Sequence, residues 1–228
     1  MKALLEVFYR PGRVFAELPG AKGQWRIPLL CNVLLAVLLA WMVPHFIGPE
    51  NIVRQRLAGN AAVTPEQAQK LIASAGSVGQ AFASYAGTIL FSLGMQAALA
   101  GMLTIFWMMR DPAPHFETML SMVTLAFFPY WLILTAMTAQ TLVTAANPAA
   151  LDFSNLVATS AATYVDKHTV TRGVYGILSN LDALSFMEMG LLGLGFARVT
   201  RSGIAFGLAV VGGLWLLYFS VMAIAVLT

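Results

Sequence analysis

The sequence predicts an all-α protein, a polytopic transmembrane helical bundle with five spans. Of its 228 residues, 59% are hydrophobic and only 10% are charged, whereas soluble domains carry about 25% charged residues. Five apolar runs approach the length of about 20 residues that a helix needs to cross a bilayer. Lysine and arginine crowd some of the intervening segments and thin out in others, which is typical of loops alternating between two sides of a membrane.

The predicted spans occupy about residues 27–47, 82–109, 116–146, 181–198 and 204–227. We assign residues 1–26 to an N-terminal segment and residues 27–228 to one transmembrane domain. Pro28 suits the first turn of the first span, and Pro44 is expected to end or kink it. The fourth run is short and contains Glu188, so a four-span arrangement or a re-entrant fourth segment stays an alternative.

The N-terminal segment is predicted to lie at the membrane interface as two short helices that Pro11-Gly12 separates. In this interpretation its apolar side chains face the membrane surface and its basic ones stay in water, namely Leu4, Leu5, Phe8 and Phe15 against Lys2, Arg10 and Arg13. The alternative is an irregular tail packed under the bundle. Because charges interrupt the apolar stretch, we do not expect a cleavable signal peptide here.

The connections between the runs differ in length. Residues 48–81 contain Thr64-Pro65-Glu66-Gln67, which predicts a capping box and a short helix through about Ser74. Residues 147–180 are polar, and Ser154 is expected to cap another short helix. A cytoplasmic N-terminus puts eight of the 13 basic residues inside, at Lys2, Arg10, Arg13, Lys22, Arg26, Arg110, Arg198 and Arg201. The positive-inside rule therefore predicts a cytoplasmic N-terminus and a C-terminus outside.

Small residues form stripes along three of the spans, and such stripes let helix backbones approach closely. They include Gly87, Gly94 and Gly101 in the second span, Gly190 and Gly193 in the fourth, and Gly212 and Gly213 in the fifth. We expect these helix-packing residues to bring the three spans together, with the fourth in the middle of the bundle. The alternative is that one stripe forms a homodimer face. Pro129 removes one amide from the third span, which makes it a hinge candidate or simply a static kink.

Glu188 is the strongest candidate for an intramembrane polar site. Ionisable side chains within membrane helices face protein or water and frequently mark ion pathways. Asp182 lies near the outer end of the same helix, and two carboxylates on one helix are able to line a cation or proton path. The alternatives for Glu188 are a carboxylate that snorkels to the interface, or a protonated one hydrogen-bonded to a neighbouring helix.

The sequence gives no support for enzyme activity, a metal site or a cofactor. GxSxG, HExxH and GxxxxGK[ST] motifs are absent. Asp111, His115 and Glu117 cluster in a short turn without a recognised metal-ligand spacing, so caps for the third span are favoured. The single cysteine, Cys31, excludes an internal disulfide. No basic tract is dense enough to indicate nucleic-acid binding.

Three segments resemble the Yip (Ypt/Rab-interacting protein) domain family of five-span membrane proteins. They are FYRPGRVFAELPGAKGQWRIPLL at 8–30, HFETMLSMVTLAFFPYWL at 115–132 with Pro129 at the family's proline, and LDALSFMEMGLLGLGFARVT at 181–200 with Asp182, Gly193 and Gly195 matching. Many members have a tryptophan where this chain has Met187. The resemblance implies a five-helix bundle with a cytoplasmic N-terminus. Eukaryotic members engage prenylated Rab-type GTPases in endoplasmic reticulum and Golgi membranes, whereas this chain is more similar to the bacterial branch.

Two functions are therefore expected from the sequence. The first is a non-enzymatic integral protein, in a bacterial inner membrane, that organises the bilayer or binds a partner such as another membrane protein or a second copy. The alternative is a small transporter or channel for a cation or proton that uses Glu188 and Asp182.

Overall fold

The computed structural model describes residues 2–20, 22–58, 63–108, 114–166 and 169–227, and side chains over the same ranges except 154, 172–173, 180 and 221–227. Helices make up 79% of the structure, and no strand occurs in the described ranges. The helices are α1 Lys2–Glu6, α2 Pro11–Ala16, α3 Arg26–Ile47, α4 Pro49–Leu57, α5 Pro65–Ser74, α6 Val78–Trp107, α7 Phe116–Thr144, α8 Arg172–Asn180, α9 Ala183–Val199 and α10 Ile204–Leu227. The prediction of an all-helical bundle is confirmed.

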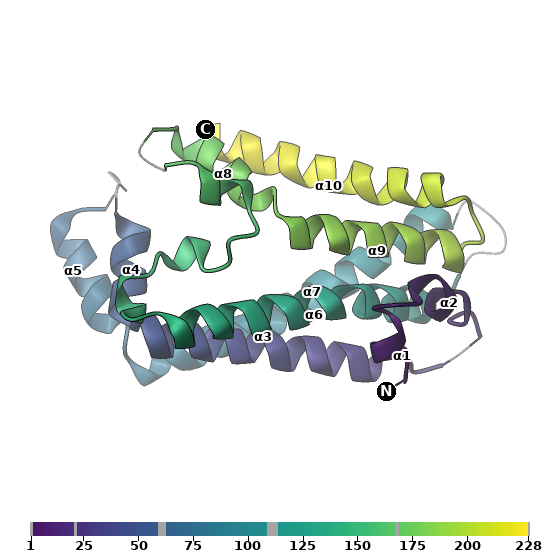
Figure 1. Ribbon diagram of the computed structural model, residues 1–228, viewed down its shortest axis with the longest axis horizontal. Coiled ribbons are helices and arrows are strands. Elements are labelled where there is room, and N and C mark those ends of the chain that lie inside the picture. Colours follow the sequence, from purple (N-terminus) through teal and green to yellow (C-terminus); the bar gives the residue numbers. More distant parts are fainter. Residues whose placement is uncertain (1, 21, 59–62, 109–113, 167–168, 228) are drawn as a thin grey trace.

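Five helices coincide with the five predicted runs and extend along the long axis of the molecule, namely α3, α6, α7, α9 and α10 (Figure 1). Three of them, α3, α6 and α7, are long and apolar enough to cross a membrane. Helix α9 has 17 residues, because Asp182 precedes it as a cap and Thr200 follows it. Pro44 does not end α3, which continues to Ile47 and stops where Gly48 adopts φ 90°.

Capping side chains explain where several of the helices begin. Thr64 and Gln67 form the predicted capping box on α5, with both reciprocal hydrogen bonds present. Ser77 accepts a hydrogen bond from the amide of Gln80 and thereby caps α6. The short helix expected near Ser154 is replaced by three 3-10 turns, at Pro148–Ala150, Phe153–Asn155 and Ala161–Tyr164. These turns form most of the connection between α7 and α8.

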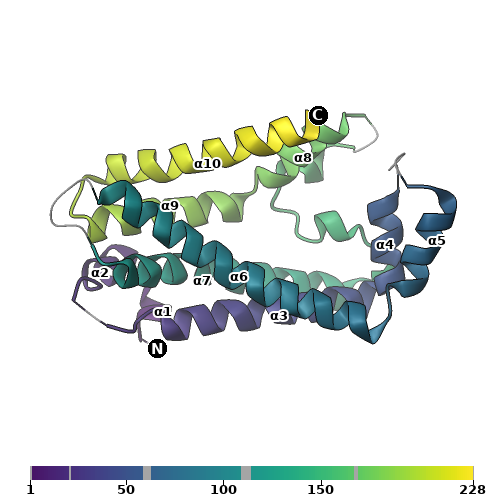
Figure 2. The ribbon, with the colours of Figure 1, turned by 180° about the vertical axis from the view of Figure 1, so that it is seen from behind.

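The centre of the packing is the first half of α7, where every side chain from Thr118 to Phe127 is buried. Helix α7 contacts α3, α6 and α9, and it occupies the position that we expected for the fourth run. Helix α9 instead lies between α7 and α10 and is buried mainly along its second half (Figures 1 and 2). Helix α10 contacts α9 in both halves, at Phe186 and at Gly193, whereas Phe15 beside Gly195 shows that α2 packs against the second half.

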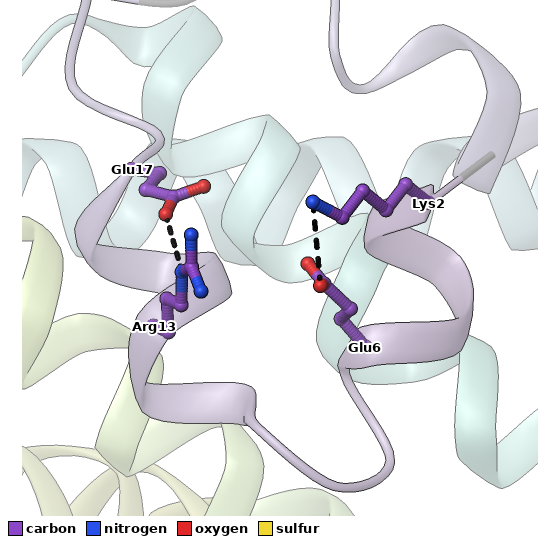
Figure 3. A network of polar contacts seen from close by, with 4 residues as sticks. All are labelled: Lys2, Glu6, Arg13 and Glu17. Atoms are coloured by element: carbon purple, nitrogen blue, oxygen red, sulfur yellow. Dashed lines mark hydrogen bonds and ion pairs between the residues drawn. The ribbon is translucent and has the colours of Figure 1, made fainter.

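The N-terminal segment forms two helices, as predicted, and both pack against the bundle. Leu4 is 8% exposed and Phe15 is fully buried, because α1 contacts α7 and α2 contacts α9. The expectation that both side chains face a membrane surface is therefore wrong for them, whereas Leu5 and Phe8 are exposed. Two ion pairs form in this segment, Lys2 with the buried Glu6 at 3.7 Å and Arg13 with the exposed Glu17, the C-cap of α2, at 2.8 Å (Figure 3).

Candidate functional site

Asp182 is the residue that joins α9 to the connection before it. Its Oδ1 accepts a hydrogen bond from the amide of Leu184 at 2.9 Å, and its Oδ2 accepts one from the hydroxyl of Ser185 at 3.1 Å. The backbone on both sides of Asp182 pairs with residues around Ser160, through the amides of Ala161 and Ala183. Asp182 is thus an N-cap, the role that aspartate fills well at helix starts.

Glu188 lies half-buried on α9. Within the described part of the chain, no hydrogen-bond partner is found for its carboxylate, in contrast to Asp182. Both acids interact electrostatically with Tyr130 of α7 and with each other. The two predicted site residues thus occupy the cap and the first half of one helix, α9.

A cavity of about 320 Å³ lies next to Asp182. Helices α3 and α7 form one wall, and the α7–α8 connection, α8 and the α9 cap form the other. The lining residues are Leu39, Val43, Tyr130, Leu134, Thr138, Phe153, Asn155, Leu156, Val157, Thr159, Ser160, Ser179 and Asp182. Apolar and polar side chains contribute to this lining in similar numbers. Glu188 is not among the lining residues.

A second polar group, which sequence reasoning missed, lies in the packed part of the bundle. The Asn32 side-chain amide donates to Oε1 of Gln96 and to the carbonyl of Thr124, each at 2.9 Å. Gln96 donates in turn to the hydroxyl and carbonyl oxygens of Ser92 at 3.2 Å. Asn32 and Gln96 are at most 1% exposed, and Oδ1 of Asn32 has no partner in the described structure. Hydrogen bonds of this kind connect helices within membranes.

The signal for this group was present in the sequence, since both amides interrupt apolar runs. Thr124 lies one residue before Leu125, whose carbonyl loses its usual helical donor because Pro129 has no N–H. Asn32 therefore supplies a donor close to the proline-altered backbone. Pro129 is buried within a continuous α7, and its role as a hinge stays a prediction.

The glycines of the predicted stripes occupy two different environments. A methyl group built on Gly193 would lie 2.9 Å from the Cα of Leu208, so this glycine marks a close approach of α9 and α10. Gly101 has only the Phe116 ring at 4.0 Å. No described atom lies within 4 Å of a methyl built on the remaining five, Gly87, Gly94, Gly190, Gly212 and Gly213. Helices α6 and α10 do not pack through these glycines within the chain; a role for them in contacts between chains stays a prediction.

Close approaches also occur at two glycines outside our predicted set of packing residues. A methyl on Gly195 would lie 2.7 Å from Met122 and 3.4 Å from Phe15, which places α9 against both α7 and α2. A methyl on Gly207 would meet the carbonyl oxygen of Gly193 directly. Glycine spacing alone did not distinguish these positions from the open ones.

Glu117, in the first turn of α7, forms hydrogen bonds with the N-terminal segment. Oε1 of Glu117 accepts the amide of Gly23 at 2.6 Å and the indole N–H of Trp25 at 3.3 Å. His115 precedes α7 without a side-chain cap, and Asp111 lies outside the described residues. In the described ranges, no three His, Cys, Asp or Glu side chains gather as metal ligands do. Glu117 thus holds the N-terminal segment against α7.

No protein-family model matches this chain, and no match was found among curated proteins or solved structures.

Proposed function

We propose that this chain is a non-enzymatic, five-span integral membrane protein of a bacterial inner membrane that acts by binding a partner within the bilayer. The lengths and apolar character of α3, α6 and α7 support membrane insertion. The alternating directions of the five long helices, visible in Figures 1 and 2, support five crossings. A basic end around α1, α2 and the α9–α10 turn supports a cytoplasmic N-terminus.

The observation that carries partner binding is the outer face of α6. Phe82, Leu90 and Phe91 on this helix are each about 70% exposed, at 72%, 70% and 68%. Gly87 and Gly94 leave gaps between these bulky side chains, with no described atom within 4 Å of a built methyl. Bulky side chains alternating with glycine gaps fit another helix better than they fit lipid alone, because a facing backbone can approach at the gaps.

The test is purification from membranes in a mild detergent, followed by mass determination of the intact complex. We expect either a stoichiometric partner or a second copy to travel with the wild-type protein. Gly94→Ile should release it without loss of folding, since the substitution touches no neighbour within the chain. Gly213→Ile on α10, which is equally open, is the matched control and should retain it. A monomer that purifies alone, with Gly94→Ile indistinguishable from wild type, would contradict the proposal.

A second candidate function is passage of a cation or proton past Glu188 and Asp182. The observation in its favour is that both acids interact with Tyr130 beside a cavity. One observation weighs against it. Buried side chains such as Phe15, Met122 and Phe196 fill the opposite half of the bundle.

Ion flux into liposomes distinguishes the two candidates. Transport requires a flux that depends on the inserted protein and disappears in Glu188→Gln, while Glu66→Gln on the exposed helix α5 leaves it unchanged. If protein-containing liposomes carry no more flux than empty ones, the transport candidate is excluded and partner binding is retained.

A further inference from the structure

We propose that the cavity between α3, α7 and the α7–α8 connection binds an organic ammonium ion, meaning a positively charged nitrogen on a short apolar body. Partner binding through α6 does not require this site, whereas the transport candidate shares Asp182 with it. The inference depends on the shape, the charge and the hydrogen-bonding capacity of the lining.

The size and apolar walls of the cavity fit a small organic molecule. Its volume of about 320 Å³ lies at the lower end of the range of about 300–1,000 Å³ for ligand pockets. Leu39 and Val43 of α3 face the cavity from one side, and Leu156 and Val157 of the connection face it from another. A bare metal ion would leave these apolar surfaces unused, whereas an alkyl or aryl group would cover them.

The charge of the lining selects a cation. Asp182 is the acidic residue among the described lining residues, and no lysine, arginine or histidine is among those described. Asp182 forms no ion pair in the described structure; the two ion pairs found there lie in α1 and α2. Arg56 lies over the ring of Phe153, 5.2 Å from its centroid, and is not itself among the lining residues. A positively charged ligand in the cavity would therefore be attracted to Asp182.

The acceptors that an ammonium group needs are also present. Each carboxylate oxygen of Asp182 accepts one capping hydrogen bond, and a carboxylate has about four acceptor sites. The carboxylate of this lining residue therefore keeps acceptor capacity. The Tyr130 ring lines the same space, and aromatic rings attract ammonium groups through their faces. Asp182 and Tyr130 thus provide a charged and an aromatic contact for one cationic group.

The experiment is calorimetric titration of the purified full-length protein with hexylammonium in detergent free of added lipid. Hexan-1-ol and hexanoate, which share the chain but not the charge, are titrated in parallel. We expect saturable binding of hexylammonium alone. Short-chain phosphatidylethanolamine and phosphatidylglycerol form a second arm, which shows whether the ammonium group comes from a free amine or a lipid headgroup.

Three variants test whether hexylammonium binds in the cavity. Asp182→Asn keeps a good N-cap while removing the charge, and it should weaken binding about tenfold or more. Leu134→Trp fills the cavity and should abolish binding. Leu132→Trp, on the same helix but outside the lining and 38% exposed, is the matched control. Gel filtration and thermal unfolding establish that each variant is folded.

The outcomes decide the proposal in either direction. Saturable binding of an amine-bearing probe that Leu134→Trp abolishes and Asp182→Asn weakens supports it, whichever arm shows the binding. Absence of binding by both amine probes overturns it, and so does equal binding of hexan-1-ol or binding that Leu134→Trp leaves unchanged. None of these results depends on whether a partner protein or an ion flux is found.

Discussion

At the end of the bundle where α1 and α2 dock, glycines bring helices into contact and large side chains fill the space between them. At the other end, around α4, α8 and the α7–α8 connection, the helices are bridged by 3-10 turns and a cavity is present. Gly195 illustrates the first arrangement, since Met122 and Phe15 occupy the volume beside it. Asp182 illustrates the second, because it caps a helix and also borders open space.

The difference shows that one helix can pack closely against its neighbours along one half and border a cavity at its other end. Helix α9 begins beside the cavity and ends in the packed half, where Leu192, Phe196 and Val199 are buried. Small residues let the helices approach closely in the packed half. Polar residues line the space at the end where the helices separate. Changes at the packed end should therefore affect stability, and changes at the cavity end should affect binding.

The largest effect is expected at the contact between α9 and α10. Gly193→Ala places a methyl 2.9 Å from the Cα of Leu208, so the two backbones must move apart. We expect a loss of about 1–3 kcal/mol, the usual effect of overpacking, measured as a lowered midpoint of thermal unfolding in detergent. Gly190→Ala adds the same methyl on the same helix where no described atom lies within 4 Å. Equal unfolding midpoints for the two variants would show that α9 is not packed more tightly at Gly193 than at Gly190.

An intermediate effect is expected for the buried amides. Asn32→Ala, Gln96→Ala and the double variant form a thermodynamic cycle on one interhelical hydrogen bond of 2.9 Å. The coupling energy should be about 1 kcal/mol, in line with polar pairs inside membranes. Thr88→Ala removes only a bond within its own exposed helix and should show no coupling to Asn32→Ala. Additive losses for Asn32 and Gln96 would mean that the pair does not connect α3 to α6.

The smallest effect is expected at the exposed ion pair of α2. The Arg13 guanidinium, by its hydrogen bond and then by its charge, holds the pKa of Glu17 below its ordinary value of 4.5. A lowered folded pKa gives stability that is present above the unfolded pKa and is lost as pH falls through the folded pKa. The pair is solvent-exposed, so its contribution is small. The unfolding midpoint of wild type should slightly exceed that of Glu17→Gln at about pH 7, and the gap should close at about pH 3. If the difference between the two unfolding midpoints stays constant between about pH 7 and pH 3, it arises from helix propensity and not from the ion pair.

The extent of each long helix could be predicted from the sequence. The third run, expected at 116–146, is the helix Phe116–Thr144, because a backbone in an apolar environment must satisfy its hydrogen bonds within the segment. Capping at Thr64 could be predicted for a similar reason, since the interaction is local. The number of membrane crossings and their direction stay predictions.

The neighbours of each helix could not be predicted in the same way. Gly94 and Gly193 both interrupt apolar helices, yet only Gly193 meets another backbone, because the contact depends on where distant segments lie. Glu117 was expected to stay in a solvated turn, whereas residues near Trp25 fold back and bind it. For Asn32 the unusual residue was visible, but its pairing with Gln96 spans two helices. A role for Asp182 and Glu188 as a site stays a prediction; the cavity beside Asp182 depends on the α7–α8 connection, whose turns carry only weak sequence signals.

The docking of Phe15 has a consequence for synthesis. Its side chain lies 3.4 Å from a methyl built on Gly195 and is fully buried, so its binding place is completed by a helix that leaves the ribosome long after Phe15 does. Until α9 has formed, α2 lacks the helix against which it packs and remains open to proteases. Resistance of the Phe15 segment to proteases would therefore indicate that α9, which is synthesised later, has packed against it.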